Sequence, residues 1–223
     1  MVTLSGAWLN PRSFTMSAED GGRHLGRILR FGGTLGTADD VWWTVLQHSL
    51  LVARLARWAS KGPRVELGCL WHDRAEVITG DWVRPWKLPE VKRAQDMLDT
   101  ISGASLGLPT FTTEEKAQIK ALDDEACVIE AHIMAPLVAR RHPDTFGTAT
   151  HADQRRRDGL FDGLWTGHFM TDVYSTWRAD GALVQLFVSE HERLMHACGL
   201  EIRAPLPISM DGEAPPHNDG EAR

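Results

Sequence analysis

The stretch WHDRAEVITGD, residues 71–81, carries one histidine, one arginine and three carboxylates, and it follows a segment with the pattern of an apolar helix. His72 and Glu76 are four residues apart, so on a helix their side chains project from one face about one turn from each other. Asp73 follows His72 directly. Imidazole and carboxylate groups are the usual ligands of divalent transition metals with a nitrogen and oxygen shell. One helix cannot direct enough such groups at an ion, so other helices must supply the rest.

Two further helices are predicted to supply the missing groups. In the helix predicted over residues 44–60, His48 shares a face with valine, leucine and alanine residues, so it faces inward. In the helix predicted from residue 112, the side chain of Asp123 lies roughly 80° from the buried direction, whereas Asp124 is roughly opposite to it. Asp123 is therefore the better inward carboxylate of two adjacent aspartates.

The hydrophobic pattern of the chain is that of an all-α protein. Apolar residues recur at spacings of three and four residues, whereas runs of alternating apolar and polar residues, which would indicate strands, are nearly absent. N-cap residues, a capping box, glycines and prolines mark where the helices begin and end. The helices predicted in this way span residues 17–30, 44–60, 64–78, from 89 to near 103–109, from 112 to a break or kink at Pro136, and 175–198. Residues 142–167 fit either a long loop or a short helix between two loops.

Composition limits the class of protein. With 223 residues, of which 43% are hydrophobic, we expect a single domain over residues 1–203 and a disordered tail over 204–223. The formal net charge of −6 argues against a protein that follows a nucleic-acid polymer, because such proteins neutralise phosphates with clustered Lys and Arg. Three widely spaced cysteines without a CxxC pair suggest neither a disulfide framework nor a thiolate zinc site. No signal-peptide pattern or run of about 18 apolar residues occurs, so we expect a cytoplasmic protein without a membrane partner.

Four segments of the chain resemble the HD superfamily of metal-dependent phosphohydrolases, which is named for an H…HD…D pattern. His48, then His72 with Asp73, then Asp123 match that pattern in order. The wider segments look like the bacterial 5′-deoxynucleotidase branch and its phage relatives, which include dATP triphosphohydrolases. They are RFGG at 30–33, QHSLLVARLA at 47–56, HDRAEVITGDWVRPWK at 72–87 and KALDDEACVIEA at 120–131. The resemblance covers about residues 17–136 and implies an HD-domain helical bundle.

The resemblance also implies a role for each matching residue. One divalent transition metal, such as Co, Mn, Zn or Fe, would be held by His48, His72, Asp73 and Asp123. Glu76 and Asp81 match the carboxylates that orient or activate the attacking water. Arg30 matches the phosphate-facing arginine of that branch. Phosphoryl transfer also needs cationic groups around the leaving charge, and Arg84 and Lys87 are further candidates near these motifs. Together with Phe31 and Trp43, these are the residues expected to contact the substrate. This division of labour is physically sound, since a metal lowers the pKa of bound water while a nearby carboxylate handles the proton.

The function implied by the resemblance is hydrolysis of a deoxyribonucleoside 5′-phosphate at the 5′ phosphoester. The products would be orthophosphate from a deoxynucleoside monophosphate or triphosphate from a dNTP such as dATP, and the motifs do not separate these outcomes. The expected partner is a small-molecule nucleotide. Because the family often pairs its subunits, the resemblance also favours a homo-oligomer.

Two other kinds of protein fit parts of the same pattern. A non-catalytic HD protein that senses a metal or a nucleotide would keep the ligands, but the presence of both Glu76 and Asp81 favours an enzyme. A purely structural helical module would use the histidines for packing. The chain also departs from the family pattern, which commonly has a small residue where Arg74 stands. Trp42 and Trp43 are a second departure, and their indoles could narrow the pocket or stack on a base or sugar.

Overall fold

The computed structural model of the chain describes residues 15–33, 43–82, 87–134 and 181–202. Helices make up most of this described part, and its β structure is confined to one isolated bridge between Leu29 and Thr44. The prediction of an all-α fold is therefore confirmed. None of the described helices is both long enough and apolar enough to span a bilayer.

Two helices form the centre of the fold. Helix α2 (Val45–Trp58) begins with a reciprocal capping box, in which the Thr44 side chain accepts from the Gln47 backbone and the Gln47 side chain accepts from the Thr44 backbone. Helix α3 (Pro63–Leu70) begins with proline, whose fixed φ suits the first helical position. These helices pack against each other and bury most of their side chains, so they carry the hydrophobic core.

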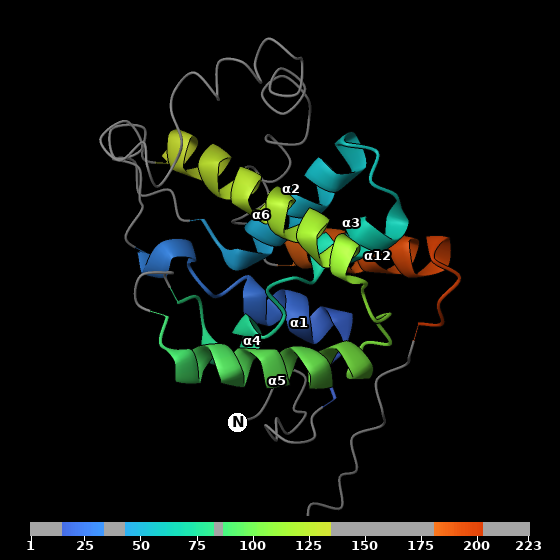
Figure 1. The fold of residues 1–223 in the computed structure, drawn as a ribbon, viewed down its shortest axis with the longest axis horizontal. Coiled ribbons are helices and arrows are strands. Elements are labelled where there is room, and N and C mark those ends of the chain that lie inside the picture. The colour runs from blue at the N-terminus through green and yellow to red at the C-terminus, as the bar shows by residue number, and fades with distance from the viewer. Residues whose placement is uncertain (1–14, 34–42, 83–86, 135–180, 203–223) are drawn as a thin grey trace, which may run out of the picture.

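Three more helices cover this centre. Helix α6 (Thr113–Met134) crosses α2 and α3 on one side, whereas α12 (Ala182–Ala197) lies along α3 and also contacts α2 (Figure 1). Helix α6 begins with the predicted capping pair, because the Thr112 hydroxyl accepts from the Glu115 backbone and the Glu115 carboxylate accepts from the Thr112 backbone. Helix α1 (Ala18–Leu25) packs against α12 and starts at the N-cap Ser17. This packing brings α2, α6 and the end of α3 together.

Two glycines allow α1 to approach the core closely. A Cβ atom at Gly21 would lie 2.7 Å from ring carbons of Trp71, and one at Gly22 would lie 3.2 Å from Phe187. The prediction that this helix reaches residue 30 is wrong, because α1 ends at Leu25 with Gly26 as its C-cap. A short 3₁₀ helix, η1 (Arg30–Gly33), follows as a separate element.

The helix predicted over residues 64–78 is interrupted, which is a second correction. Helix α3 ends at Leu70, and the short helix α4 (Glu76–Thr79) begins after an irregular turn. Within the turn, backbone carbonyls accept bonds from side chains: Nδ1 of His72 lies 2.7 Å from the Cys69 oxygen, and Arg74 donates to the Trp71 oxygen at 2.9 Å. These bonds replace continued helical pairing, so His72 and Asp73 stand on a turn rather than on one face of a helix.

Helix α5 (Pro89–Ser105) runs on the opposite side of the fold from α6 (Figure 1). It contacts α4 and is tied to the turn by Arg74, whose Nε donates to the Asp99 carbonyl at 3.0 Å. The start predicted at Pro89 is confirmed. The turn that carries His72 and Asp73 is thus held between α5 and α6.

Several predictions concern residues outside the described part of the chain. They are Arg84, Trp42, the break at Pro136, the segment 142–167, the first residues of the helix predicted over 175–198, and the tail 204–223. From Ala182 onward, the last helix is present as α12. The single domain over residues 1–203 and the homo-oligomer stay predictions.

Candidate metal centre and adjoining pocket

Three side chains from separate elements converge at one point of the fold. His48 comes from α2, His72 from the turn after α3, and Asp123 from α6, and one ligand atom of each lies within 4.8 Å of the others. Nε2 of His48 is 3.0 Å from Nε2 of His72 and 3.2 Å from Oδ1 of Asp123. Two nitrogen ligands bound about 2.1 Å from a single ion lie roughly 3 Å apart. His48, His72 and Asp123, called the metal centre or the centre below, could therefore hold a metal ion.

The second nitrogen of each imidazole fixes which nitrogen faces the centre. Nδ1 of His48 lies 2.6 Å from Oε1 of Glu130, and Nδ1 of His72 lies 2.7 Å from the Cys69 carbonyl oxygen. A carbonyl and an ionised carboxylate only accept hydrogen bonds, so both Nδ1 atoms donate. Both Nε2 atoms then point lone pairs at the same place, which is the arrangement that bonds behind metal-binding histidines produce.

Lone pairs at this distance repel each other unless a cation lies between them. Although burial opposes it, the carboxylates of Asp73 and Asp123 raise the pKa of His72 well above its usual value, so they favour positive charge at this imidazole. A metal ion that binds there must displace any proton on this nitrogen. The lone pairs and carboxylates at the centre therefore favour a positive charge there.

Asp73 lies next to the group formed by His48, His72 and Asp123. Its Oδ2 lies 3.2 Å from Nε2 of His72 and 3.6 Å from Nε2 of His48. This oxygen is buried without a hydrogen bond. Burial disfavours the charged form, but His72, His48 and Arg30 outweigh it and hold the pKa of Asp73 below its usual range. A buried, ionised oxygen that lacks a hydrogen bond is chemically suited to a cation, and the predicted role of Asp73 as a fourth ligand stays a prediction.

The structure distinguishes the two adjacent aspartates of α6. The side chain of Asp123 is 15% exposed and faces both histidines, whereas that of Asp124 is 49% exposed and pairs with Lys120. Burial opposes ionisation of Asp123, but bonds from His48 and His72 hold its pKa far below the usual range. The prediction that Asp123 faces inward is confirmed.

Glu130 supports the centre from behind. Its Oε1 accepts from His48 and from Nε1 of Trp43, the latter at 2.7 Å, and Glu130 is fully enclosed. Trp43 is therefore a buried residue whose indole N–H is held by Glu130, and it does not line the pocket described below. Its predicted contact with substrate stays a prediction. Sequence reasoning assigned no role to Glu130, although its place seven residues after Asp123 on one helix face could have indicated one.

Arg30 lies between three carboxylates. Its guanidinium is 3.6 Å from Asp73, 3.7 Å from Asp81 and 3.6 Å from Glu130. Burial acts against its charge, but these carboxylates raise the pKa of Arg30 above its normal value. The side chain therefore stays cationic and offsets the acidic groups behind the centre.

Asp81 anchors the 3₁₀ helix η1. Its Oδ2 accepts from the backbone N–H of Phe31 at 2.7 Å, and Phe31 has a φ of +56°, in the left-handed region that glycine favours. The bond helps to hold this strained residue in place. Neither residue lines the pocket next to the centre. Their predicted catalytic and substrate-binding roles stay predictions.

Glu76 is the carboxyl group next to the centre that has no ion partner of its own in the described residues. It is buried, and its Oε2 makes no hydrogen bond. Burial, together with the nearby charges of Asp73 and Asp81, raises the pKa of Glu76 to about 9. A carboxyl group of this kind can hold and transfer a proton near neutral pH.

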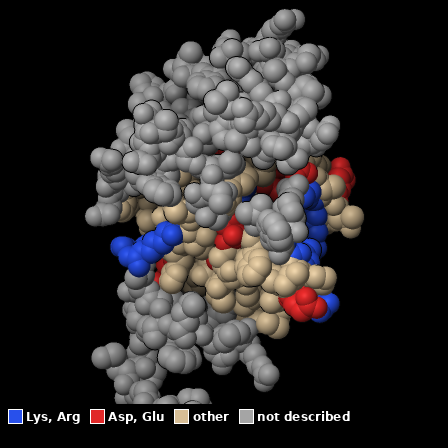
Figure 2. Space-filling view, turned by 90° about the vertical axis from the view of Figure 1, so that its left-hand side faces the viewer, with Lys and Arg blue, Asp and Glu red and all other residues tan. Residues whose placement is uncertain are grey.

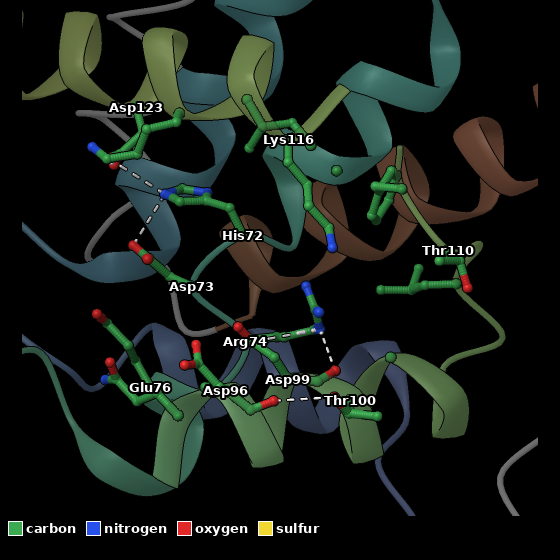
Figure 3. A pocket seen from close by; sticks show the side chains of 18 of the residues that line it. His72, Asp73, Arg74, Glu76, Asp96, Asp99, Thr100, Thr110, Lys116 and Asp123 are labelled. Atoms are coloured by element: carbon green, nitrogen blue, oxygen red, sulfur yellow. Dashed lines mark hydrogen bonds and ion pairs between the residues drawn. The ribbon is translucent and has the colours of Figure 1, made fainter. Parts of the chain in front are cut away.

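A pocket of about 850 Å³ opens beside the centre between α5 and α6. Its wall includes His72, Asp73, Glu76 and Asp123, and Figure 3 shows these residues on one side of it. The predicted substrate residue Lys87 also lines it. Sequence reasoning noted Arg74 only as a departure from the family pattern, and it missed the other charged residues of the wall, namely Lys92, Asp96, Asp99, Lys116 and Lys120. The spacing of Lys116, Lys120 and Asp123 along one helix face could have indicated those on α6.

Charged side chains of both signs lie on the described surface (Figure 2). Figure 2 shows basic and acidic side chains interspersed among uncharged residues on the described part of one face.

Neither the protein-family models nor the curated proteins with which the sequence was compared give a match. The site itself therefore carries the functional argument.

Proposed function

We propose that the protein is a metal-dependent phosphohydrolase of the HD type. Within that class, we propose that it hydrolyses deoxyribonucleoside 5′-phosphates at the 5′ phosphoester. The observation that carries the proposal is the convergence of two imidazole lone pairs and the oxygens of Asp73 and Asp123 at the wall of a pocket. The ligand set supports a cation with open coordination positions, which distinguishes a catalytic site from a closed structural one.

The proposed reaction is attack of water on the α-phosphorus. A new P–O bond forms, the bond between this phosphorus and the 5′ oxygen breaks, and the 5′ oxygen takes up a proton. A deoxynucleoside leaves with orthophosphate from a monophosphate, or with inorganic triphosphate from a dNTP. When bound, a divalent cation would lower the pKa of water and polarise a phosphoryl oxygen.

Residues of the chain would handle the proton and the charge. Glu76 is buried beside Asp73, and its pKa of about 9 keeps it protonated near neutral pH. It can therefore give its proton to the 5′ oxygen as the ester bond breaks and then take up the proton that the attacking water loses. Lys87 lines the pocket and can offset phosphate charge. Arg30 already lies among three carboxylates, so its proposed effect is to limit repulsion between the acidic groups and the substrate.

A combined metal and activity measurement tests the proposal. The metal content of the purified full-length chain is determined, and the protein is then assayed with Mn, Co, Zn and Fe on a panel of dNMPs and dNTPs. Phosphate, triphosphate and deoxynucleoside products are all quantified. About one equivalent of metal with metal-dependent deoxynucleoside release supports the proposal. Metal and nucleotide binding without turnover would indicate a sensor, and absence of metal binding would indicate a structural module.

A further inference from the structure

Two cationic side chains line the pocket away from the metal ligands. Arg74 belongs to the turn after α3, and Lys116 to the first turn of α6. Figure 3 shows the Lys116 ammonium and the Arg74 guanidinium directed toward the same part of the pocket, apart from Asp73 and Glu76. They come from different elements, so the fold brings them together.

Lys116 is available to a ligand. It is exposed at the pocket, and no acidic group lies within ion-pair distance of it among the residues that the structure describes. The other lysines of the wall on these helices differ in this respect: Lys92 pairs with Asp96, and Lys120 pairs with Asp123 and Asp124. Lys116 is therefore a positive charge in the pocket without a matching negative charge in the described part of the chain.

The Arg74 side chain is fixed in place, but only some of its N–H donors make hydrogen bonds. Its Nε donates to the Asp99 carbonyl and its NH1 to the Trp71 carbonyl, whereas no described residue accepts from NH2. A guanidinium has more N–H donors than these two carbonyls use. The fixed side chain can thus present further donors to a ligand at little entropic cost.

The charge of Arg74 is poorly offset by the protein. Its nearest carboxylate oxygen, Oδ1 of Asp99, is 3.6 Å from Nε and makes no hydrogen bond. The Arg74 side chain is only 15% exposed, so water offsets little of its charge. An anion at this position would stabilise the guanidinium, whereas a neutral nucleobase would leave it uncompensated.

From these contacts we infer that Arg74 and Lys116 form a subsite for the phosphates of a nucleoside triphosphate beyond the α-phosphate. The inference rests on the proposed function and selects the triphosphate as the substrate class. A monophosphate has one phosphoryl group, which the reaction places at His72, Asp73 and Asp123. The second and third phosphates of a dNTP supply the additional negative charge that the cationic pair requires.

The direct test is binding of inorganic tripolyphosphate to the full-length, EDTA-treated protein by calorimetry, with orthophosphate in parallel. Losing one charge-assisted contact costs about 1.5–3 kcal/mol, so Lys116→Ala should weaken tripolyphosphate binding by about tenfold or more. Arg74→Gln should act in the same direction. Lys61→Ala is the matched control, because Lys61 is an exposed lysine outside the pocket and its removal changes the net charge equally.

The Lys116→Ala variant decides the test. Arg74→Gln also removes bonds that hold the turn, because the Arg74 side chain is only 15% exposed and donates to two backbone carbonyls, whereas loss of an exposed lysine leaves the core intact. The subsite is overturned if Lys116→Ala and the native protein bind tripolyphosphate equally, or if tripolyphosphate binds no tighter than orthophosphate. Different results would overturn the phosphate subsite and the phosphohydrolase function. Tripolyphosphate binding that depends on Lys116, without any nucleotide turnover, overturns the phosphohydrolase alone. Turnover of dNMPs without Lys116-dependent binding overturns the subsite alone.

Discussion

Nε2 of His48 and Nε2 of His72 lie 3.0 Å apart, although each ring already donates a hydrogen bond through its other nitrogen. Two buried lone pairs are stable at this distance only with positive charge between or beside them. Asp73 and Asp123 supply negative charge on the same side. This relationship links the packing of α2, the turn and α6 to the binding of a cation.

Removal of one imidazole should abolish metal binding. For His72→Ala we expect the metal content to fall below one tenth of that of the native protein and hydrolysis to be lost, because loss of a ligand exceeds the roughly 10–100-fold effect of outer partners. Metal analysis after gel filtration measures this. His196→Ala, at an exposed histidine of α12, is the control and should keep the metal. Equal metal content in both variants would contradict the assignment of His72.

The two adjacent aspartates should behave differently. Asp123→Asn removes an oxygen that faces both histidines, so metal affinity should fall by more than about tenfold. Asp124→Asn removes an exposed partner of Lys120 and should leave metal affinity within about twofold, since such pairs contribute little. Competition with a metal-binding dye compares the two variants. The reverse order would show that α6 presents a different face to the centre.

Glu76 should affect the rate without affecting the metal. We expect Glu76→Gln to retain the metal and to lower kcat by about 10²–10⁴-fold, the usual contribution of general acid–base catalysis. The control is Glu114→Gln, an exposed position near the start of α6. Full activity of Glu76→Gln on every deoxynucleotide tested would exclude Glu76 as the group that transfers the proton.

Helical periodicity was sufficient to predict the all-α fold and the inward direction of Asp123, because both depend on local pattern. The turn between α3 and α4 was not predictable in the same way. It depends on side chains of His72 and Arg74 that bond nearby carbonyls and on the approach of α5 through Asp99. The sequence also does not predict that Arg74 and Lys116 line the same pocket, since this arises only when the turn and α6 pack around it.

Alanine should destabilise the protein at Gly21, where α1 packs closely against the core, but not at Gly103 of α5. Gly21→Ala would place a methyl group 2.7 Å from the Trp71 ring, so we expect a loss of about 1–3 kcal/mol in the free energy of unfolding. In α5, Gly103→Ala would meet Arg74 at an ordinary 3.5 Å and gain helix propensity, so stability should stay equal or rise by about 0.5–1 kcal/mol. Urea unfolding followed by circular dichroism distinguishes them. A Gly21→Ala variant as stable as the native chain would contradict the close contact between α1 and Trp71.

The buried histidine of α12 should make stability depend on pH. His191 accepts a hydrogen bond from Nε1 of Trp71 at 3.1 Å, and burial lowers its pKa from 6.5 to about 4. Above pH 6.5 the imidazole is neutral in both the folded and the unfolded chain, so stability is fully present there. Between pH 6.5 and about 4 the unfolded chain binds a proton that the folded chain does not, so stability falls as the pH falls.

The expected loss over this window is about 3 kcal/mol, and no further loss from this group follows below it. His191→Gln keeps an acceptor for the Trp71 indole but does not titrate, so its free energy of unfolding should lack this part of the slope. Urea unfolding of both proteins at several pH values isolates the contribution, because the metal ligands titrate equally in each. His196→Gln, at an exposed histidine of the same helix, should keep the native slope. Parallel pH profiles for the native protein and His191→Gln would show that His191 does not stay neutral in the core.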